Sequence, residues 1–214
     1  MRTIDMSTWP RRKHFEFFQA MNHPQVGLCA NVDITALRAA TKERQVSISI
    51  AVTYVLARTA NAIPEFRLRI RGAQVVEHDV VHPSFTVMAT DDLFSFCTMI
   101  YDADFARFAE AGAAAVARAQ ANPNLENEPG QDDLLYMSVI PWVSFTAFLH
   151  PMQMHPVDSM PRIAWGKFFA ENDRLKMPLA VQGHHAVMDG VHVGRYYEQV
   201  QGLLDRPAEW MSNP

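Results

Sequence analysis

Two adjacent histidines and a nearby aspartate form the stretch whose residue types are best suited to chemistry. His184 and His185 follow an apolar run at residues 177–181, and Asp189-Gly190 begins four residues after His185. A general base needs an imidazole with a pKa near neutrality and a neighbouring group that fixes its tautomer and orientation. Asp189 could fix the ring, and Gly190 permits a tight turn. Local chemistry alone leaves two interpretations open: a catalytic base or a structural histidine at a strand end.

The elements around this stretch follow from hydrophobic periodicity. The apolar run predicts a buried strand that ends at the histidines, and residues 191–204 predict an amphipathic helix. Strands are expected at 26–32, 68–71, 74–78, 85–89, 94–101, 134–148 with an interruption at Pro141, and 163–169; helices at 34–43, 47–63 and 104–121; and loops at 122–131 and 149–161. Short turns join several successive strands, which favours an α/β (α+β) fold with a mixed β-sheet packed by helices. We expect one domain, residues 1–214.

Composition restricts the class of protein. The chain has 214 residues, 49% of them hydrophobic, and a formal net charge of −4, which argues against a nucleic-acid-binding protein. Two cysteines fit neither a metal site nor a disulfide framework. Residues 1–13 lack the apolar core of a signal peptide, and no apolar run reaches about 18 residues, so a cytoplasmic location is expected. His150 and His155 lie in a loop and are expected to be exposed, without a metal.

The sequence His184-His185-Ala186-Val187-Met188-Asp189-Gly190-Val191-His192 carries a family resemblance. It resembles the His-x-x-x-Asp-Gly motif of CoA-dependent acyltransferases, and its extended form resembles the trimeric chloramphenicol acetyltransferases. Met188 stands where that family usually has Cys. Further blocks match the family in order at residues 9–18, 56–67 and 138–148, so the resemblance covers almost the whole chain.

The resemblance implies a role for each matched residue. His185 is expected to be the general base, Ser138 the hydroxyl that stabilises the tetrahedral intermediate, and Arg11 a structural partner of Asp189. The acceptor pocket would be lined by Phe17, Phe18, Cys29 and Phe94, although apolar residues in such positions often belong to a core. The CoA site would include Trp142, Lys167 and Phe168. The resemblance also implies acetyl-CoA as cosubstrate, chloramphenicol as acceptor, antibiotic resistance, and a homotrimer with active sites at subunit interfaces.

The chain departs from the family at several positions near the expected substrates. Ala164 stands where the family has Thr, Trp165 replaces a smaller Met, and Gly183 replaces Val. Ser47 and Ser49 fall where the family has Lys and Tyr near the CoA adenosine, and the loop at 149–161 differs from the usual sequence. Two alternatives therefore stay open: another small hydroxylated acceptor, or a catalytically weak homologue that binds hydrophobic ligands. A dehydrogenase-complex core is disfavoured, because no lipoyl domain or Ala/Pro-rich linker precedes the motifs.

Overall fold

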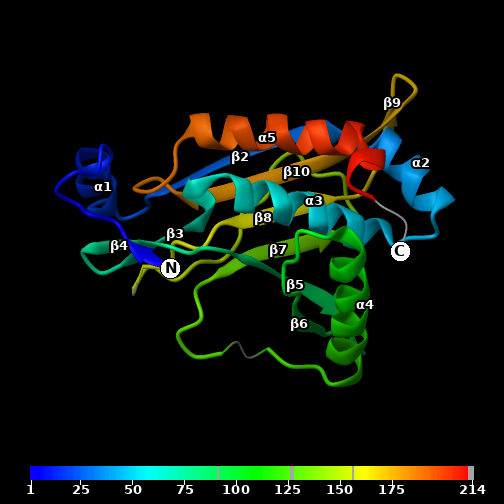
Figure 1. Ribbon diagram of the computed structural model, residues 1–214, viewed down its shortest axis with the longest axis horizontal. Helices are drawn as coiled ribbons and strands as arrows, with labels where there is room; N and C mark the ends of the chain where they lie inside the picture. The colour runs from blue at the N-terminus through cyan, green and yellow to red at the C-terminus, as the bar shows by residue number, and fades with distance from the viewer. Residues whose placement is uncertain (91, 126–127, 156, 212–214) are drawn as a thin grey trace.

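The larger of two β-sheets forms the frame of the molecule. The computed structural model describes residues 1–90, 92–125, 128–155 and 157–211, so residues 126–127 and 156 of the two expected loops lie outside the described residues. The sheet runs in the order β2-β10-β8-β7-β5-β6, with β9 paired to β10. β7 is parallel to both β5 and β8, and the other pairs are antiparallel. The mixed sheet expected from the sequence is confirmed (Figure 1).

The elements of the described chain have the following bounds. The larger sheet contains β2 (Gln25–Asp33), β5 (His82–Met88), β6 (Phe94–Thr98), β7 (Leu134–Ile140), β8 (Arg162–Gly166), β9 (Phe169–Glu171) and β10 (Arg174–His184). A smaller sheet in the order β1-β4-β3 contains β1 (Arg2–Thr3), β3 (Leu68–Arg71) and β4 (Gln74–Glu77). The α-helices are α1 (Arg12–Gln19), α2 (Thr35–Glu43), α3 (Ile48–Ala62), α4 (Phe105–Ala121) and α5 (Gly190–Asp205), and short 3-10 helices lie at Pro64–Arg67 and Pro207–Glu209.

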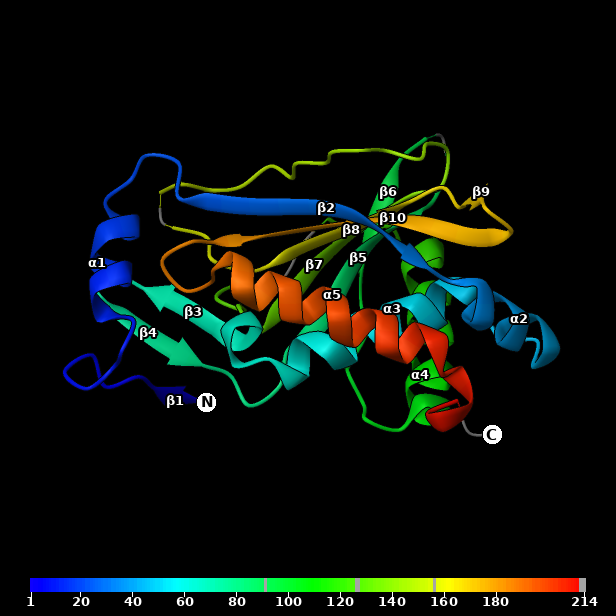
Figure 2. The same cartoon turned by 90° about the horizontal axis from the view of Figure 1, so that it is seen from above.

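The two faces of the larger sheet have different surroundings, because successive side chains of a strand point to opposite sides. One face joins the helices in a common core that includes Met137, Ile163, Trp165, Leu179 and Val181. In Figures 1 and 2, α3 and α5 run along this face. The opposite face carries two rows of paired residues: Ser138, Ala164 and Ala180 in one row, and Tyr136, Arg162 and Gln182 in the next. This second face is the more polar one.

Helix α3 shows why the helical layer forms. The helix is apolar around most of its circumference, as expected for a helix that is covered on all sides. Ser47 begins the helix by accepting a hydrogen bond from the Ile50 amide, and Pro64 prevents its continuation. Helix α5 is tied to α3 by Tyr196, whose hydroxyl donates to the Leu56 carbonyl oxygen at 3.0 Å. Because α5 follows the histidine motif directly, this contact fixes the motif against the core.

The strand expected at 94–101 ends at Thr98, and two further predicted strands need correction. The strand expected at 134–148 ends at Ile140, and Pro141 begins an irregular segment that reaches β8. The strand expected at 163–169 ends at Gly166, where a side chain would lie within 2.7 Å of the Val143 carbonyl oxygen. β9 then pairs with β10 through a hairpin turn, whose residues Asn172 and Asp173 have positive φ angles of 48° and 59°. Both corrections concern places where Pro or a close backbone approach ends a strand that the apolar pattern would continue.

Candidate active site

The His185 ring is held in one tautomer. Its Nδ1 lies 2.9 Å from Asp189 Oδ1 and 3.1 Å from the Met188 carbonyl oxygen. Both neighbours are acceptors, so Nδ1 carries the proton and the lone pair of the neutral ring is on Nε2. Phe18 stacks on the imidazole, with ring centroids 3.8 Å apart and planes 9° apart. The arrangement supplies what a general base requires: a fixed ring with its basic nitrogen on the side opposite the carboxylate.

Arg11 and Asp189 form the predicted ion pair. Arg11 Nη1 donates to Asp189 Oδ2, and Arg11 Nη2 donates to the His185 carbonyl oxygen at 3.2 Å. The hydrogen bond from Arg11 holds the pKa of Asp189 below its ordinary value, so the carboxylate stays charged. Arg11 lies just before α1 and Asp189 just before α5, so the pair connects the two ends of the chain. Arg11 thereby orients the Asp189 carboxylate, which in turn orients the His185 ring.

His192 and Glu65 make a contact that was not expected from the sequence. His192 Nδ1 accepts a hydrogen bond from the Asp189 amide at 2.8 Å, so the proton of the neutral ring is on Nε2. That Nε2 lies 3.3 Å from Glu65 Oε1. The hydrogen bond between the Asp189 amide and His192, the third residue of α5, fixes the first turn of the helix as a capping side chain does. The sequence contained the spacing of a helix N-terminal capping box, because His192 follows Asp189 by three residues.

His184 is not positioned as a base. Its side chain is buried, and Nδ1 accepts from the Ala186 amide at 3.2 Å. Burial lowers the pKa of His184 to about 4, so the ring is neutral at pH 7. Its role is structural, and the second histidine of the pair is the candidate base, in agreement with the alternation of side chains along β10.

Ser138 lines a separate cavity on the polar face of the sheet. The cavity has a volume of about 550 Å³, and its lining includes Phe94, Phe96, Trp142, His150 and Arg162. His150 was expected to be exposed, but it is half-buried and its Nε2 lies 3.2 Å from Ser138 Oγ. His155 is exposed as expected. The cavity thus combines apolar walls with a hydroxyl and an imidazole at one point, as ligand sites commonly do.

Strand register separates the two candidate catalytic groups within one chain. Ser138 pairs with Ala164, and Ala164 pairs with Ala180. His185 lies five residues beyond Ala180 in the chain. With about 3.3 Å per residue along the strand and about 4.8 Å between strands, the Cα atoms of Ser138 and His185 are roughly 19 Å apart. The side chains cannot span this distance, so one chain does not bring them to the same substrate atom.

The remaining candidate residues fall into two groups. Phe17 packs edge-on against Phe18 beside His185, while Cys29 pairs with Ala180 and therefore lies on the same face of the sheet as Ser138. Trp142 lines the Ser138 cavity, and the adjacent residue Val143 accepts a hydrogen bond from the Lys167 amide at 2.9 Å. The structure thus places the segment that holds Trp142 and Val143 against the segment that holds Lys167 and the half-buried Phe168.

Three positions that differ from the family pattern now have structural surroundings. Ala164 lies beside Ser138 in the sheet and is completely buried. Trp165 points to the opposite face, joins the core with the helices, and does not line the cavity beside Ser138. A side chain at Gly183 would approach Met188 Sδ to 2.6 Å. The long side chain of Met188 therefore fills the space that Gly183 leaves empty.

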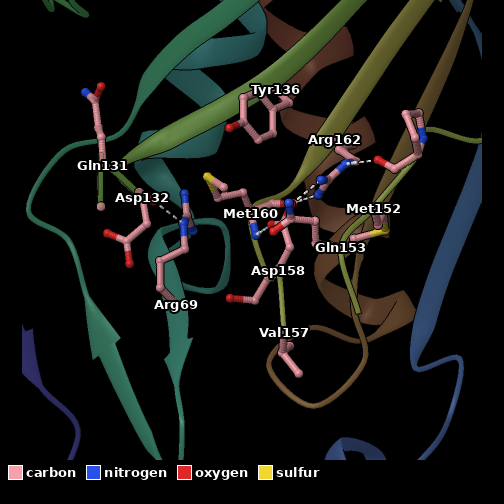
Figure 3. Close-up of a pocket in the computed structure, with 13 residues that line it drawn as sticks. Arg69, Gln131, Asp132, Tyr136, Met152, Gln153, Val157, Asp158, Met160 and Arg162 are labelled. Carbon is pink, nitrogen blue, oxygen red and sulfur yellow. Dashed lines mark hydrogen bonds and ion pairs between the residues drawn. The ribbon is translucent and has the colours of Figure 1, made fainter. Parts of the chain in front are cut away.

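A larger cavity of about 660 Å³ adjoins the first one, and Tyr136 and Arg162 line both (Figure 3). Arg162 Cζ lies 5.3 Å from the centre of the Tyr136 ring, and Arg162 Nη2 donates to Asp158 Oδ2. Arg69 on another wall donates to the carbonyl oxygens of Phe66, Leu68, Asp132 and Leu134. Burial lowers the pKa of Arg69 to about 10, so it remains a cation at pH 7. Both arginines that line this cavity therefore have hydrogen-bond acceptors around them.

Within the described parts of the chain, no three His, Cys, Asp or Glu side chains gather as metal ligands would. Nor does any helix of those parts have the length and apolar character needed to cross a membrane.

Comparisons with known proteins cover almost the whole chain. The family model described as "Chloramphenicol acetyltransferase" matches residues 1–201. A chloramphenicol acetyltransferase from a Klebsiella species is 35% identical over 211 residues, which cover 97% of this chain and 94% of the relative. One from Bacillus pumilus is 30% identical over 205 residues, covering 95% and 93%.

Solved structures give the same result for the fold. A chloramphenicol acetyltransferase structure superposes with a TM-score of 0.86 at 26% identity, covering 95% of this chain and 99% of the other. The cubic core of the pyruvate dehydrogenase multienzyme complex superposes with a TM-score of 0.70 at 18% identity, covering 92% of this chain and 88% of the other, and shows a shared fold only.

Proposed function

Since this chain belongs to the chloramphenicol acetyltransferase family and is an acyltransferase, we propose that it moves the acetyl group of acetyl-CoA to a hydroxyl of chloramphenicol and so inactivates the antibiotic. The observation that carries the proposal is the locked His185 ring, whose Nε2 is the free basic nitrogen. The names and extent of the relatives support the substrate. The proposed acyltransferase domain spans residues 1–214, and the proposed location is the cytoplasm.

The proposed reaction is a single displacement at the thioester. His185 Nε2 removes the proton of the acceptor hydroxyl while the hydroxyl oxygen attacks the acetyl carbonyl carbon. The carbon–sulfur bond then breaks, and His185 returns the proton to the CoA thiolate. General base catalysis of this kind contributes about 10²–10⁴-fold to a rate. Asp189 and Arg11 hold the ring and do not exchange protons, because Arg11 keeps Asp189 ionised.

The oxyanion that forms during attack needs a hydrogen-bond donor, and Ser138 is the proposed one. A single donor of this type contributes about 2.7–4 kcal/mol to transition-state stabilisation. The separation of roughly 19 Å within one chain supports a site that combines His185 of one subunit with Ser138 of the partner subunit. We therefore propose a shared site at each subunit interface, and we propose the homotrimer because the family resemblance implies it and a heterologous contact whose rotation closes gives a ring.

The two sides of the proposed interface carry different substrate contacts. Phe17 and Phe18 would contact the acceptor from the His185 side, and Phe94 from the cavity beside Ser138. Cys29, which ends the row of Ser138, Ala164 and Ala180 on the same face of the sheet, would contact the acceptor from that face. CoA would bind along Trp142, Lys167 and Phe168. These assignments rest on the family motifs and on the adjacency of the segments that carry them.

Thiol release from acetyl-CoA tests the proposal. The purified protein should release thiol only when chloramphenicol is present. His185→Ala should lower kcat by about 10²–10⁴-fold, while the matched control His155→Ala, in the exposed loop, should leave it unchanged. A His185→Ala variant with wild-type kcat would overturn the assignment of the base.

A second acceptor remains a candidate because of the cavity beside Ser138. Arg162, Tyr136 and His150 give its walls polar groups, and Ala164 contributes no hydroxyl beside Ser138. These residues favour a hydroxylated acceptor with its own polar substituents. Release with an alcohol panel but not with chloramphenicol would identify this case. Silence of the whole panel, with ligand binding retained, would indicate a binding protein.

Mixed subunits test the shared site. His185→Ala and Ser138→Ala proteins should each be nearly inactive. Unfolding and refolding them together in equal amounts should restore about a quarter of the wild-type activity, because only interfaces that join an intact His185 to an intact Ser138 work. Sedimentation should give three times the mass of one chain. A mixture that stays inactive would contradict the shared site.

A further inference from the structure

A second histidine adjoins the proposed oxyanion donor. His150 Nε2 lies 3.2 Å from Ser138 Oγ, within hydrogen-bond distance. The ring packs edge-on against Phe148, with centroids 4.8 Å apart and planes 72° apart. The His150 amide donates to Gln182 Oε1 at 3.2 Å, which anchors the segment after β7 to β10. The imidazole is thus held against Ser138 by an aromatic contact on its own segment and by the neighbouring strand.

The surroundings of His150 keep its ring neutral. Burial is the main cause and the nearby Arg162 cation a second one, and together they lower the pKa of His150 to about 4. A ring with so low a pKa is a poor base at pH 7, so it is unsuited to removing the proton of Ser138. It retains one N–H donor and one lone pair. The remaining question is which of these faces the serine.

We propose that His150 is a positioning residue for acetyl transfer, and that its Nε2–H donates to Ser138 Oγ so that the single hydroxyl proton of Ser138 points at the developing oxyanion. This inference rests on the proposed role of Ser138. A serine hydroxyl has one proton and two lone pairs. If His150 Nε2 accepted instead, the proton would be used within the pair and none would remain for the oxyanion. Ala164, the neighbour of Ser138 in the sheet, has no hydroxyl for this task.

Kinetics of paired variants separate positioning from packing. His150→Leu removes the donor and keeps a side chain of similar size. It should lower kcat by about 3- to 10-fold, the effect of one neutral hydrogen bond, and leave the KM for acetyl-CoA unchanged. His150→Gln keeps an N–H donor and should recover most of the loss. In a Ser138→Ala protein, His150→Leu should have no further effect, because the two residues act through one interaction.

Several outcomes would overturn the inference. An equal loss from His150→Leu with and without Ser138 would mean that the ring only supports the fold. A His150→Leu enzyme with a higher kcat than wild type would mean that His150 Nε2 accepts a hydrogen bond from the Ser138 hydroxyl and so keeps it from the oxyanion. His155→Leu serves as the matched control and should change nothing.

A measurement without turnover keeps this inference distinct from the proposed function. In the full-length protein labelled with ¹⁵N histidine, the His150 resonances should report a neutral ring protonated on Nε2 at pH 6. Ser138→Ala should shift the Nε2 resonance of His150 and leave that of His155 in place. A ring protonated on Nδ1, or an Nε2 resonance insensitive to Ser138→Ala, would refute the inference. If wild-type protein acetylates no alcohol, the proposed function fails, and the resonances still decide the role of His150.

Discussion

Gly183→Val should destabilise the protein because Met188 already occupies the space that a side chain needs. A Cβ atom at Gly183 would lie 2.6 Å from Met188 Sδ and 3.2 Å from Met188 Cε. Met188 is itself buried in the core, so it cannot swing out of the way. Overpacking of this kind costs about 1–3 kcal/mol. For a chain of this length, each kcal/mol lowers Tm by about 2–4 °C, so the expected fall is roughly 2–12 °C.

The double variant gives the sharper test. Met188→Cys shortens the offending side chain, and in the Gly183→Val background it should restore most of the lost stability. Urea unfolding of the four proteins should give a favourable coupling of about 1–3 kcal/mol. Gly194→Ala is the control, because a Cβ at Gly194 meets nothing within 4 Å. A Gly183→Val protein within about 0.5 kcal/mol of wild type, or one that Met188→Cys does not improve, would refute the reasoning.

Three further predictions concern charged and titrating groups. Asp189→Ala should lower the free energy of unfolding in urea by about 3 kcal/mol, because it leaves Arg11 unpaired, and it should also lower kcat, because it frees the His185 ring. The control Glu16→Ala, in an exposed ion pair, should change the free energy of unfolding by less than about 1 kcal/mol. Asp158→Ala should lower the urea stability by about 3–5 kcal/mol, because it strands the buried Arg162 cation; an unchanged midpoint would contradict this. Tm should be steady above about pH 6.5 and fall towards pH 4, because burial lowers the pKa of both His184 and His150 to about 4, so the unfolded chain takes up protons that the folded protein does not. The fall should be shallower in His150→Leu than in wild-type protein, as measured by thermal scans.

The sequence predicted the fold and the secondary structure around His185 well, for a physical reason. Residues 177–204 contain a strand pattern, a turn signal and a helix pattern in succession, so local chemistry and periodicity agree there. The pairing of Arg11 with Asp189 came from the family motif, since nothing in spacing brings two residues at opposite ends of the chain together. The register between neighbouring strands could not be predicted from the sequence. The distance between Ser138 and His185 within one chain depends on that register, so it could not be predicted either.

The contact of His150 with Ser138 could not have been predicted from composition. The segment that follows Pro141 has no periodicity, so its path across the polar face of the sheet depends on tertiary contacts such as that of the His150 amide with Gln182. A loop histidine was therefore expected in solvent. The sequence also leaves the orientation of Trp165 open, because alternation along β8 does not tell which face of the sheet meets the helices.

The ion pair between Arg11 and Asp189 has a consequence for synthesis in the cell. The two residues are 178 positions apart. A ribosome that adds about 5–20 residues per second leaves Arg11 without its partner for roughly 9–36 s. β2 waits almost as long, because its partner β10 is also made near the end. The apolar strand β2 therefore stays unpaired, and open to misfolding, until translation is nearly complete. A premature stop codon before β10 would leave β2 permanently without its partner strand.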